Sequence, residues 1–127
     1  MKQKFSKTWN RSTQPRKQRK YRYNAPLSTK SKFMGSHLSK ELKEKYNKRS
    51  AVIRKGDSVK VLRGQFKKKT GKVDSVNIKK TKVYINGIEI TKKDGTKALY
   101  PINPSNIMIT GLNLDDKKRK KSLERKK

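Results

Sequence analysis

Residues 54–78 contain two strand-like runs that flank a short basic loop. In the first run Val59 and Val61 alternate with polar residues, which is the period of a half-buried β-strand. The apolar pattern resumes at Val73 and Val76, and their spacing of three instead of two predicts a β-bulge. The sequence therefore predicts a strand, a turn and a second strand in this stretch.

Gly64 and Gly71 bracket the loop between the two runs, and three lysines lie between them. Glycine adopts a positive φ without steric cost and also lets another part of the backbone approach closely. We therefore expect both glycines to have structural roles. For Gly71, which stands where the loop re-enters a strand, we expect either a positive φ or a close backbone neighbour.

This stretch resembles the KOW motif, which occurs in small SH3-like β-barrels of ribosomal and transcription proteins. The matching residues are Lys55-Gly56-Asp57, Val59, Val61, Arg63-Gly64, Phe66-Lys67, Gly71-Lys72-Val73 and Val76. The sequence departs from the motif at Lys68, where the family often has glycine. The resemblance implies a small SH3-like barrel and a place in the machinery that handles nucleic acids.

The charge of the chain predicts a polyanionic partner. Among 127 residues, 38 are Lys or Arg and 9 are Asp or Glu, giving a formal charge of +29, and only 29% are hydrophobic. Such a chain cannot bury all of itself, so part of it is disordered or ordered by a partner. Nucleic acid fits this charge better than an anionic membrane, because neutralised phosphates release counterions.

Several classes of function are not expected. No stretch approaches the roughly 18 apolar residues of a membrane-spanning helix, and the N-terminus has no signal-peptide pattern. The absence of cysteine excludes disulfides and thiol-ligated metals and fits the cytosol. The single histidine, His37, has no partners at metal-ligand spacing. Without a nucleophile–base pattern, we expect no enzyme activity, cofactor, metal or small-molecule substrate.

Residues 1–40 contain 12 Lys or Arg and no acidic residue. Five aromatic residues are interleaved with these cations: Phe5, Trp9, Tyr21, Tyr23 and Phe33. This composition fits an arm that lies along RNA, with cations on phosphates and aromatic rings against exposed bases. The alternative is a solvated tail with nonspecific contacts. Residues 15–23 begin with a helix-compatible proline, but like charges predict that this helix forms only against RNA.

Residues 39–48 are expected to form a short helix. One face carries three apolar residues at a spacing of four, namely Leu38, Leu42 and Tyr46. Ser39 can cap the helix N-terminus, and Asn47 can take the left-handed conformation at its end. The apolar stripe predicts a packing face rather than a binding face.

Strand character continues in four apolar residues: Val83, Ile85, Ile88 and Ile90. Asn86-Gly87 fits either a type I′ hairpin turn or a glycine kink within one bent strand. We favour the kink because Asp94-Gly95 supplies the next turn. Pro101 and Pro104 predict an irregular or edge segment. Residues 112–127, with 8 Lys or Arg and 3 acids, form a charged tail that need not be ordered.

Four blocks occur in a characteristic order: residues 14–27, residues 38–46, the KOW stretch and residues 101–109. Together they resemble the archaeal and eukaryotic branch of the large-subunit ribosomal protein family numbered twenty-four, called twenty-six in eukaryotes. The short chain favours an archaeal source. Asn47 and Asn103 depart from the glycine and histidine expected at these positions.

This resemblance implies a structural constituent of the large ribosomal subunit in the cytoplasm. It also implies binding to large-subunit rRNA near its 5′ domain, an early role in assembly, and a position near the peptide exit tunnel. The partners would be rRNA and neighbouring large-subunit proteins. Two alternatives stay open: a basic architectural protein outside the ribosome, and a KOW-domain transcription factor. The latter carries a further folded domain, and residues 1–50 are too polar to form one.

The predicted fold is mostly β: a small SH3-like KOW barrel with a short preceding helix and basic extended arms at both ends. The predicted parts are an rRNA-binding arm (1–36), a helix and linker (37–50), the barrel (51–111) and a basic tail (112–127). Expected RNA contacts are Arg11, Arg16, Lys17, Arg19, Lys20 and Arg22 in the arm, and Arg63, Lys67, Lys68, Lys69 and Lys72 around the KOW loop. The alternative for Lys67–Lys69 is an exposed hairpin tip.

Overall fold

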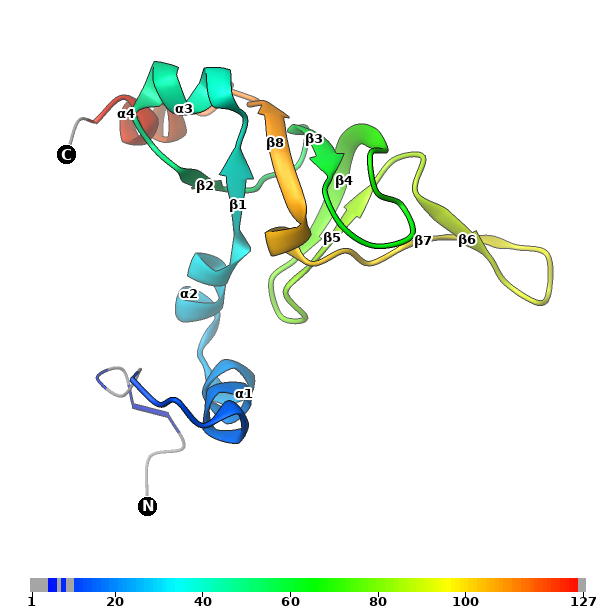
Figure 1. The fold of residues 1–127 in the computed structure, drawn as a ribbon, viewed down its shortest axis with the longest axis horizontal. Helices are drawn as coiled ribbons and strands as arrows, with labels where there is room; N and C mark the ends of the chain where they lie inside the picture. The colour runs from blue at the N-terminus through cyan, green and yellow to red at the C-terminus, as the bar shows by residue number, and fades with distance from the viewer. Residues whose placement is uncertain (1–4, 7, 9–10, 126–127) are drawn as a thin grey trace.

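The structure, a computed structural model, describes residues 5, 6, 8 and 11–125. The helical elements are α1 (Pro15–Asn24), α2 (Leu27–Lys30), η1 (Ser31–Met34), α3 (Lys40–Tyr46), η2 (Pro104–Asn106) and α4 (Lys117–Glu124). The strands are β1 (Gly35–Leu38), β2 (Ser50–Val52), β3 (Ser58–Val61), β4 (Thr70–Asn77), β5 (Lys82–Ile85), β6 (Glu89–Thr91), β7 (Lys97–Leu99) and β8 (Ile107–Gly111). Figure 1 shows α1 at one end of the molecule, and the β6–β7 hairpin projects at another.

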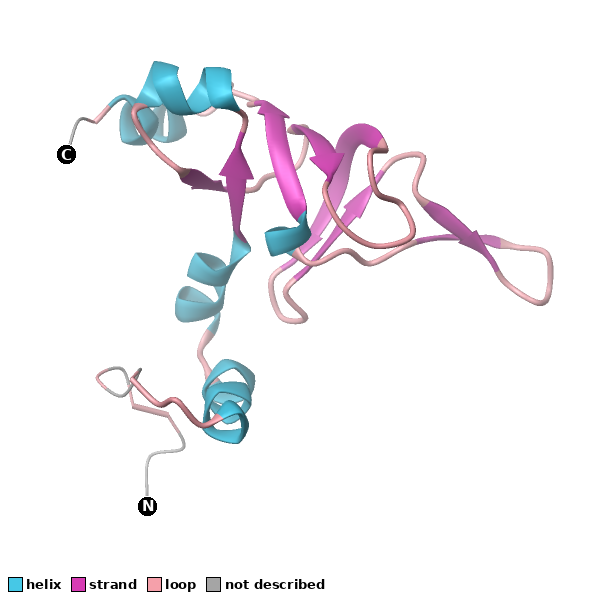
Figure 2. Ribbon diagram, in the orientation of Figure 1, coloured by secondary structure: helices cyan, strands magenta, loops and turns pink. Residues whose placement is uncertain are grey.

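In the described part of the chain, six strands form one sheet in the order β2-β1-β8-β3-β4-β5, and β6 and β7 form a separate two-stranded sheet. Figure 2 shows all the strands in magenta. Within this sheet β1 and β8 run parallel, and the other neighbours are antiparallel. The predicted mostly β class is therefore confirmed. The sheet is not a closed barrel in the described part of the chain, because β2 and β5 form its two edges. One isolated bridge joins Val83 of β5 to Ile102.

The alternating pattern of β3 builds the centre of the core. Val59 and Val61 lie opposite Ile109 and Ile107 of β8, and all four side chains are buried. The complete buried cluster is Met34, Leu38, Ile53, Val59, Val61, Val73, Val83, Ile85, Ile88, Ile102, Ile107 and Ile109. Burying a side chain of this size contributes roughly 1.5–3 kcal/mol, so this cluster is the main source of folding free energy.

Two local predictions within the sheet can be compared with the structure. The β4–β5 register shifts between Val73 and Ser75, which confirms the predicted bulge. At Asn86-Gly87 the N–H of Ile88 donates to the carbonyl of Ile85 at 3.2 Å, and Gly87 has φ +80°. This is a β-turn between two strands that do not pair with each other. It is neither the hairpin turn nor the favoured kink within one strand, so that preference is wrong.

The sheet begins earlier in the chain than expected. Met34 is only 1% exposed and belongs to the core, and β1 starts at Gly35. The Ser36 hydroxyl is buried and donates to the carbonyl of Pro104 at 2.9 Å. The sequence predicts the strands within residues 51–111, but β1 lies across the predicted arm and linker. Truncation after residue 36 would therefore remove part of the core. The division into arm, linker, barrel and tail otherwise stays a prediction.

The helix after β1 agrees with its predicted capping. The N–H of Leu42 donates to Ser39 Oγ at 3.4 Å, and Asn47 ends α3 with φ 49° and ψ 40°. Leu42 packs against the core. The seven-residue helix is thus fixed at both ends by the residues that the sequence singled out.

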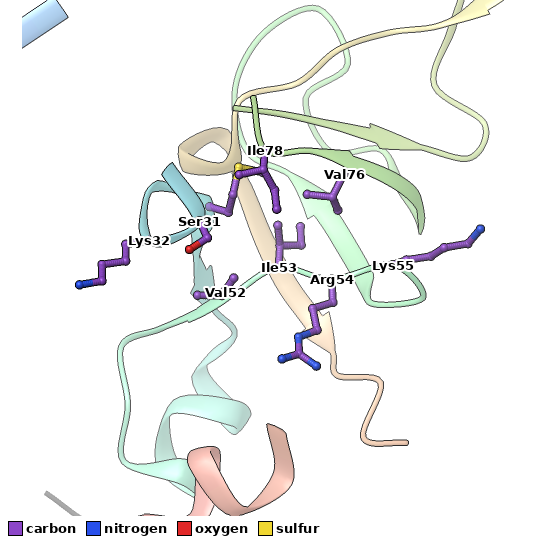
Figure 3. A pocket seen from close by; sticks show the side chains of 9 residues that line it. Ser31, Lys32, Val52, Ile53, Arg54, Lys55, Val76 and Ile78 are labelled. Carbon is purple, nitrogen blue, oxygen red and sulfur yellow. The ribbon is translucent and has the colours of Figure 1, made fainter. Parts of the chain in front are cut away.

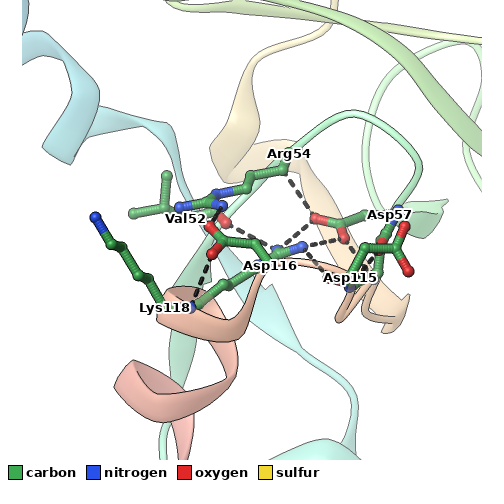
Figure 4. Close-up of polar contacts among 8 residues, drawn as sticks. Val52, Arg54, Asp57, Asp115, Asp116 and Lys118 are labelled. Atoms are coloured by element: carbon green, nitrogen blue, oxygen red, sulfur yellow. Dashed lines mark hydrogen bonds and ion pairs between the residues drawn. The ribbon is translucent and has the colours of Figure 1, made fainter.

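The charged C-terminal segment, whose order the sequence left open, is held by a buried ion pair (Figure 4). The two guanidinium nitrogens of Arg119 on α4 donate to the two carboxylate oxygens of Asp57 at 2.6 and 2.7 Å. Arg119 also donates to the carbonyls of Asn113 (2.7 Å) and Val52 (3.1 Å). Asp57 is 0% exposed and Arg119 is 6% exposed, so α4 is part of the folded domain.

Gly71 has a negative φ, but its position leaves no room for a side chain. A Cβ built there would lie 2.6 Å from the carbonyl oxygen of Asn86 and 2.8 Å from Cγ2 of Ile85. Of the two roles expected for Gly71, the structure shows the close backbone approach.

We predict that Gly71→Ala destabilises the domain by about 1–3 kcal/mol, because the added methyl collides with backbone and with the core. Gly35→Ala is the matched control, since the nearest atom to its Cβ is 3.8 Å away. Denaturant unfolding of both variants measures the difference. Equal denaturation midpoints for Gly71→Ala and the parent would show that the close approach of Asn86 does not require glycine at position 71.

Arg119→Met should destabilise the protein by about 3–5 kcal/mol, because it leaves the Asp57 carboxylate buried without its partner. Arg54→Met removes the exposed ion pair with Asp116 and should have a much smaller effect. Thermal unfolding of both variants gives the comparison. Similar losses of stability in the two variants would mean that burial does not determine how much the Asp57–Arg119 pair contributes to the free energy of unfolding.

Candidate nucleic-acid interface

All eleven cations expected to contact RNA are exposed. The two ion pairs found in the described part of the chain use other cations, Arg54 and Arg119. The structure therefore leaves the positive charge of the predicted set unneutralised by protein carboxylates. It does not bring the eleven together, because the arm group lies on and before α1 and the other group surrounds the β3–β4 loop, well apart in Figure 1.

The helix α1 displays five of these cations, namely Arg16, Lys17, Arg19, Lys20 and Arg22. It has no acidic residue in its first turn, where the helix dipole would favour one. Like charges at i,i+4, such as Arg16 and Lys20, each cost about 0.2–0.5 kcal/mol in an isolated helix. A polyanion lying along α1 would relieve this repulsion, and no acidic side chain of α1 does so.

Tyr21 of α1 packs against two other aromatic rings of the arm, and the expectation that this helix forms only against RNA stays a prediction. The rings of Phe5 and Tyr21 lie 4.9 Å apart, and Tyr21 meets Phe33 edge-on at 6.3 Å. These rings therefore pack within the protein. Tyr23 is 82% exposed and accessible to bases, while Trp9 lies outside the described residues.

The loop between β3 and β4 is fixed by its backbone. The N–H of Lys68 donates to the carbonyl of Val61, and the N–H of Val61 donates to the carbonyl of Lys69, both at 2.9 Å. Phe66 anchors the loop on Tyr100 at a ring distance of 5.1 Å, and Lys69 Nζ lies 5.2 Å from the Phe66 ring centre. The loop thus presents its cations on a rigid support.

Two residues of this loop have positive φ. Gly64 has φ +94°, which fits its predicted structural role, and Lys68 has φ +71°. Left-handed geometry at a non-glycine residue costs roughly 1–2 kcal/mol. This explains why glycine is preferred at the position of Lys68 in the motif. The present chain adopts a positive φ at this position with a lysine and thereby places a cation on the turn.

The described residues contain no group of three or more His, Cys, Asp and Glu that could hold a metal ion. Hydrogen bonds from the Thr96 hydroxyl and N–H lower the pKa of Asp94, and a hydrogen bond from Arg54 lowers the pKa of Asp116. Both carboxylates are therefore ionised near neutral pH and serve a turn and a helix cap. No helix of the described chain is long and apolar enough to cross a membrane.

The family model that describes the eukaryotic ribosomal proteins L26 and their archaeal L24 counterparts matches residues 12–126. The chain belongs to this ribosomal protein family. A relative from Methanocorpusculum labreanum, named large ribosomal subunit protein uL24, is 52% identical over 113 residues, covering 89% of this chain and 93% of the relative. A relative of the same name from Methanosphaera stadtmanae is 48% identical over 115 residues, covering 91% and 98%. The family resemblance inferred from four sequence blocks is confirmed.

Membership of this family also confirms the prediction that the chain is not an enzyme, because the family is structural rather than enzymatic. Sequence reasoning missed Arg119 and Asp57 as partners. Asp57 was visible only as part of the KOW motif, and Arg119 stands in a run of five basic residues that gives no local signal.

We predict that Lys68→Gly raises stability by about 0.5–1 kcal/mol, because it removes the cost of left-handed geometry at a lysine. It should also reduce the salt dependence of RNA binding by the loss of one cation. Lys67→Gly is the control, since it removes the same charge at a residue with negative φ. Chemical denaturation that finds Lys68→Gly less stable than Lys67→Gly would contradict this account of the turn.

Proposed function

We propose that this chain is a structural constituent of the cytoplasmic large ribosomal subunit and binds large-subunit rRNA. The observation that carries this proposal is the set of exposed cations on α1 and the β3–β4 loop that form no ion pair among the described residues. A chain of charge +29 that leaves these cations without carboxylate partners in its described part is suited to neutralising a dense line of phosphates. The names of both relatives, large ribosomal subunit protein uL24, support the same assignment.

We further propose an early assembly role, with binding near the 5′ domain of the rRNA and a position near the exit tunnel beside other large-subunit proteins. The family resemblance is the basis for these details. The buried core and the Asp57–Arg119 pair support early binding. A domain that is folded before it meets RNA can dock without first paying the entropy of ordering its loop.

We infer that the sheet is built as an SH3-like barrel whose closure is limited to one bridge. Val83 of β5 and Ile102 exchange two backbone hydrogen bonds of 2.9 Å. From Ile102 the chain passes through η2 into β8, which pairs with β3. The neighbours β3, β4, β5, Ile102 and β8 thus follow one another in a ring. The bulges in β3–β8 and β4–β5 support the bending that a barrel needs.

The arm and the loop have different tasks in this proposal. The cations of α1 and Arg11 lie along phosphates, and the exposed ring of Tyr23 meets an unpaired base. The loop cations bind a second backbone segment from a rigid support. Such electrostatic contacts should each contribute about 0.7–0.9 to the slope of log K against log salt.

The test is a pair of triple variants with equal loss of charge. Replacing Lys17, Arg19 and Lys20 of α1 with glutamine should lower the salt slope of binding to a large-subunit rRNA transcript by roughly 2 units. Replacing Lys92, Lys93 and Lys97 of the exposed β6–β7 hairpin with glutamine changes the net charge equally and should leave the slope almost unchanged. Filter binding across a salt series gives both slopes.

Equal slopes in the two triple variants would show that only net charge matters and that α1 has no specific role. Circular dichroism should be identical for both variants and the parent, because none of the six side chains is buried.

A further inference from the structure

A groove of about 490 Å³ runs between η1, the chain that follows β2 and the end of β4 (Figure 3). Its apolar lining consists of Met34, Val52, Ile53, Val76 and Ile78. Val52 is 47% exposed and Ile78 is 38% exposed. They are two of the five large hydrophobic side chains that are exposed in the described residues. The structure thus leaves aliphatic surface uncovered in this groove.

Three cations stand around this aliphatic surface. Lys32 and Lys55 extend from opposite sides of the groove in Figure 3, and Arg54 lies between Ile53 and Lys55 along the chain. An ion pair with Asp116 holds the Arg54 guanidinium in place. Lys32 and Lys55 form no ion pair in the described part of the chain. No acidic side chain lines the groove, so the two lysines, whose charges are not paired there, favour an anionic occupant.

We propose that this groove receives one unpaired nucleotide of the bound RNA. The base lies on Val52 and Ile78, the adjoining phosphates bind Lys32 and Lys55, and the Arg54 plane contacts the base edge or a phosphate. This inference rests on the proposed RNA-binding function and adds a site that reads RNA structure. It uses none of the eleven cations assigned to the arm and the loop.

A nucleotide fits this chemistry because it joins a base with apolar faces to anionic phosphates. Proteins recognise RNA chiefly at loops and bulges, where bases leave the stack and enter pockets with aromatic or apolar walls. The volume of the groove lies within the range of roughly 300–1,000 Å³ found for pockets that enclose small ligands. A paired helix would present only phosphates to the groove and would leave the aliphatic surface exposed to water.

The groove differs from the arm in the kind of free energy that it supplies. Contact of a base with Val52 and Ile78 removes apolar surface from water and releases no counterions. Loss of this contact should therefore weaken binding without changing the salt slope. Loss of Lys32 and Lys55 should change the slope. The change in affinity at constant salt slope therefore reports on Val52 and Ile78, and the change in salt slope reports on Lys32 and Lys55.

The experiment uses the full chain and a large-subunit rRNA transcript. The double variant Val52→Thr, Ile78→Thr keeps β-branched side chains at two exposed positions and should bind about tenfold more weakly with an unchanged salt slope. Lys32→Gln, Lys55→Gln should lower the slope by roughly 1.4–1.8 units. Ile90→Thr, at a 41% exposed isoleucine of β6 outside the groove, is the matched control and should bind like the parent.

A fully paired RNA duplex of equal length supplies the second comparison. The parent and the double variant Val52→Thr, Ile78→Thr should bind this duplex with equal affinity. The proposal is overturned if this variant binds the transcript like the parent, or if Ile90→Thr shows the same loss. It is also overturned if the variant binds the transcript normally but is lost from subunits reconstituted with total large-subunit protein, since the occupant is then a protein. Failure of the RNA-binding function itself looks different, because the parent would show no salt-dependent binding to the transcript.

Discussion

The buried pair of Asp57 and Arg119 joins parts of the chain that are far apart in sequence. Its six hydrogen bonds link the start of β3, the end of β2, the segment after β8 and the helix α4. Removing two charges from water costs several kcal/mol per ion, and only good geometry with further hydrogen bonds offsets that cost. Here both oxygens of Asp57 accept two hydrogen bonds each. Both carboxylate oxygens therefore keep their hydrogen-bond partners as long as α4 stays in place.

This arrangement also explains how so basic a chain can have a defined fold. The chain has only 9 acidic residues for 38 Lys and Arg, so most of its cations cannot have a protein partner. Asp57 forms the buried ion pair with Arg119. Asp116 caps the N-terminus of α4 and also binds Arg54. The remaining charge stays on the surface, where its mutual repulsion opposes compactness. Binding to a polyanion turns this unfavourable term into binding free energy.

Local pattern predicted much of the sheet and its turns. The alternation of Val59 and Val61 identified β3, the spacing from Val73 to Val76 identified the bulge, and Ser39 identified the start of α3. These features depend on neighbours a few residues away, which a sequence displays directly. Gly71 was also singled out from the sequence, but its requirement comes from the backbone of Asn86, which is distant in sequence, and not from a positive φ.

The features that were missed depend on distant partners. Arg119 and Asp57 are 62 residues apart, and nothing in a basic run distinguishes the one arginine that enters the core. β1 shows no alternation of apolar and polar residues, because one of its two buried side chains is the polar Ser36. The hydroxyl of Ser36 is satisfied by a hydrogen bond to the carbonyl of Pro104, 68 residues away. The groove is assembled from three separate segments. Its surface exists only after the sheet has formed.

The central claim is that α1 and the β3–β4 loop both lie against rRNA. Because the chain has no cysteine, a single introduced cysteine can carry a tethered hydroxyl-radical source at a chosen position. The three proteins Arg19→Cys, Lys67→Cys and Lys93→Cys place that source on α1, on the loop and at the hairpin tip. In assembled large subunits, the account predicts strong rRNA cleavage from positions 19 and 67 and weaker cleavage from position 93. Cleavage from position 93 that equals or exceeds that from positions 19 and 67 would contradict it.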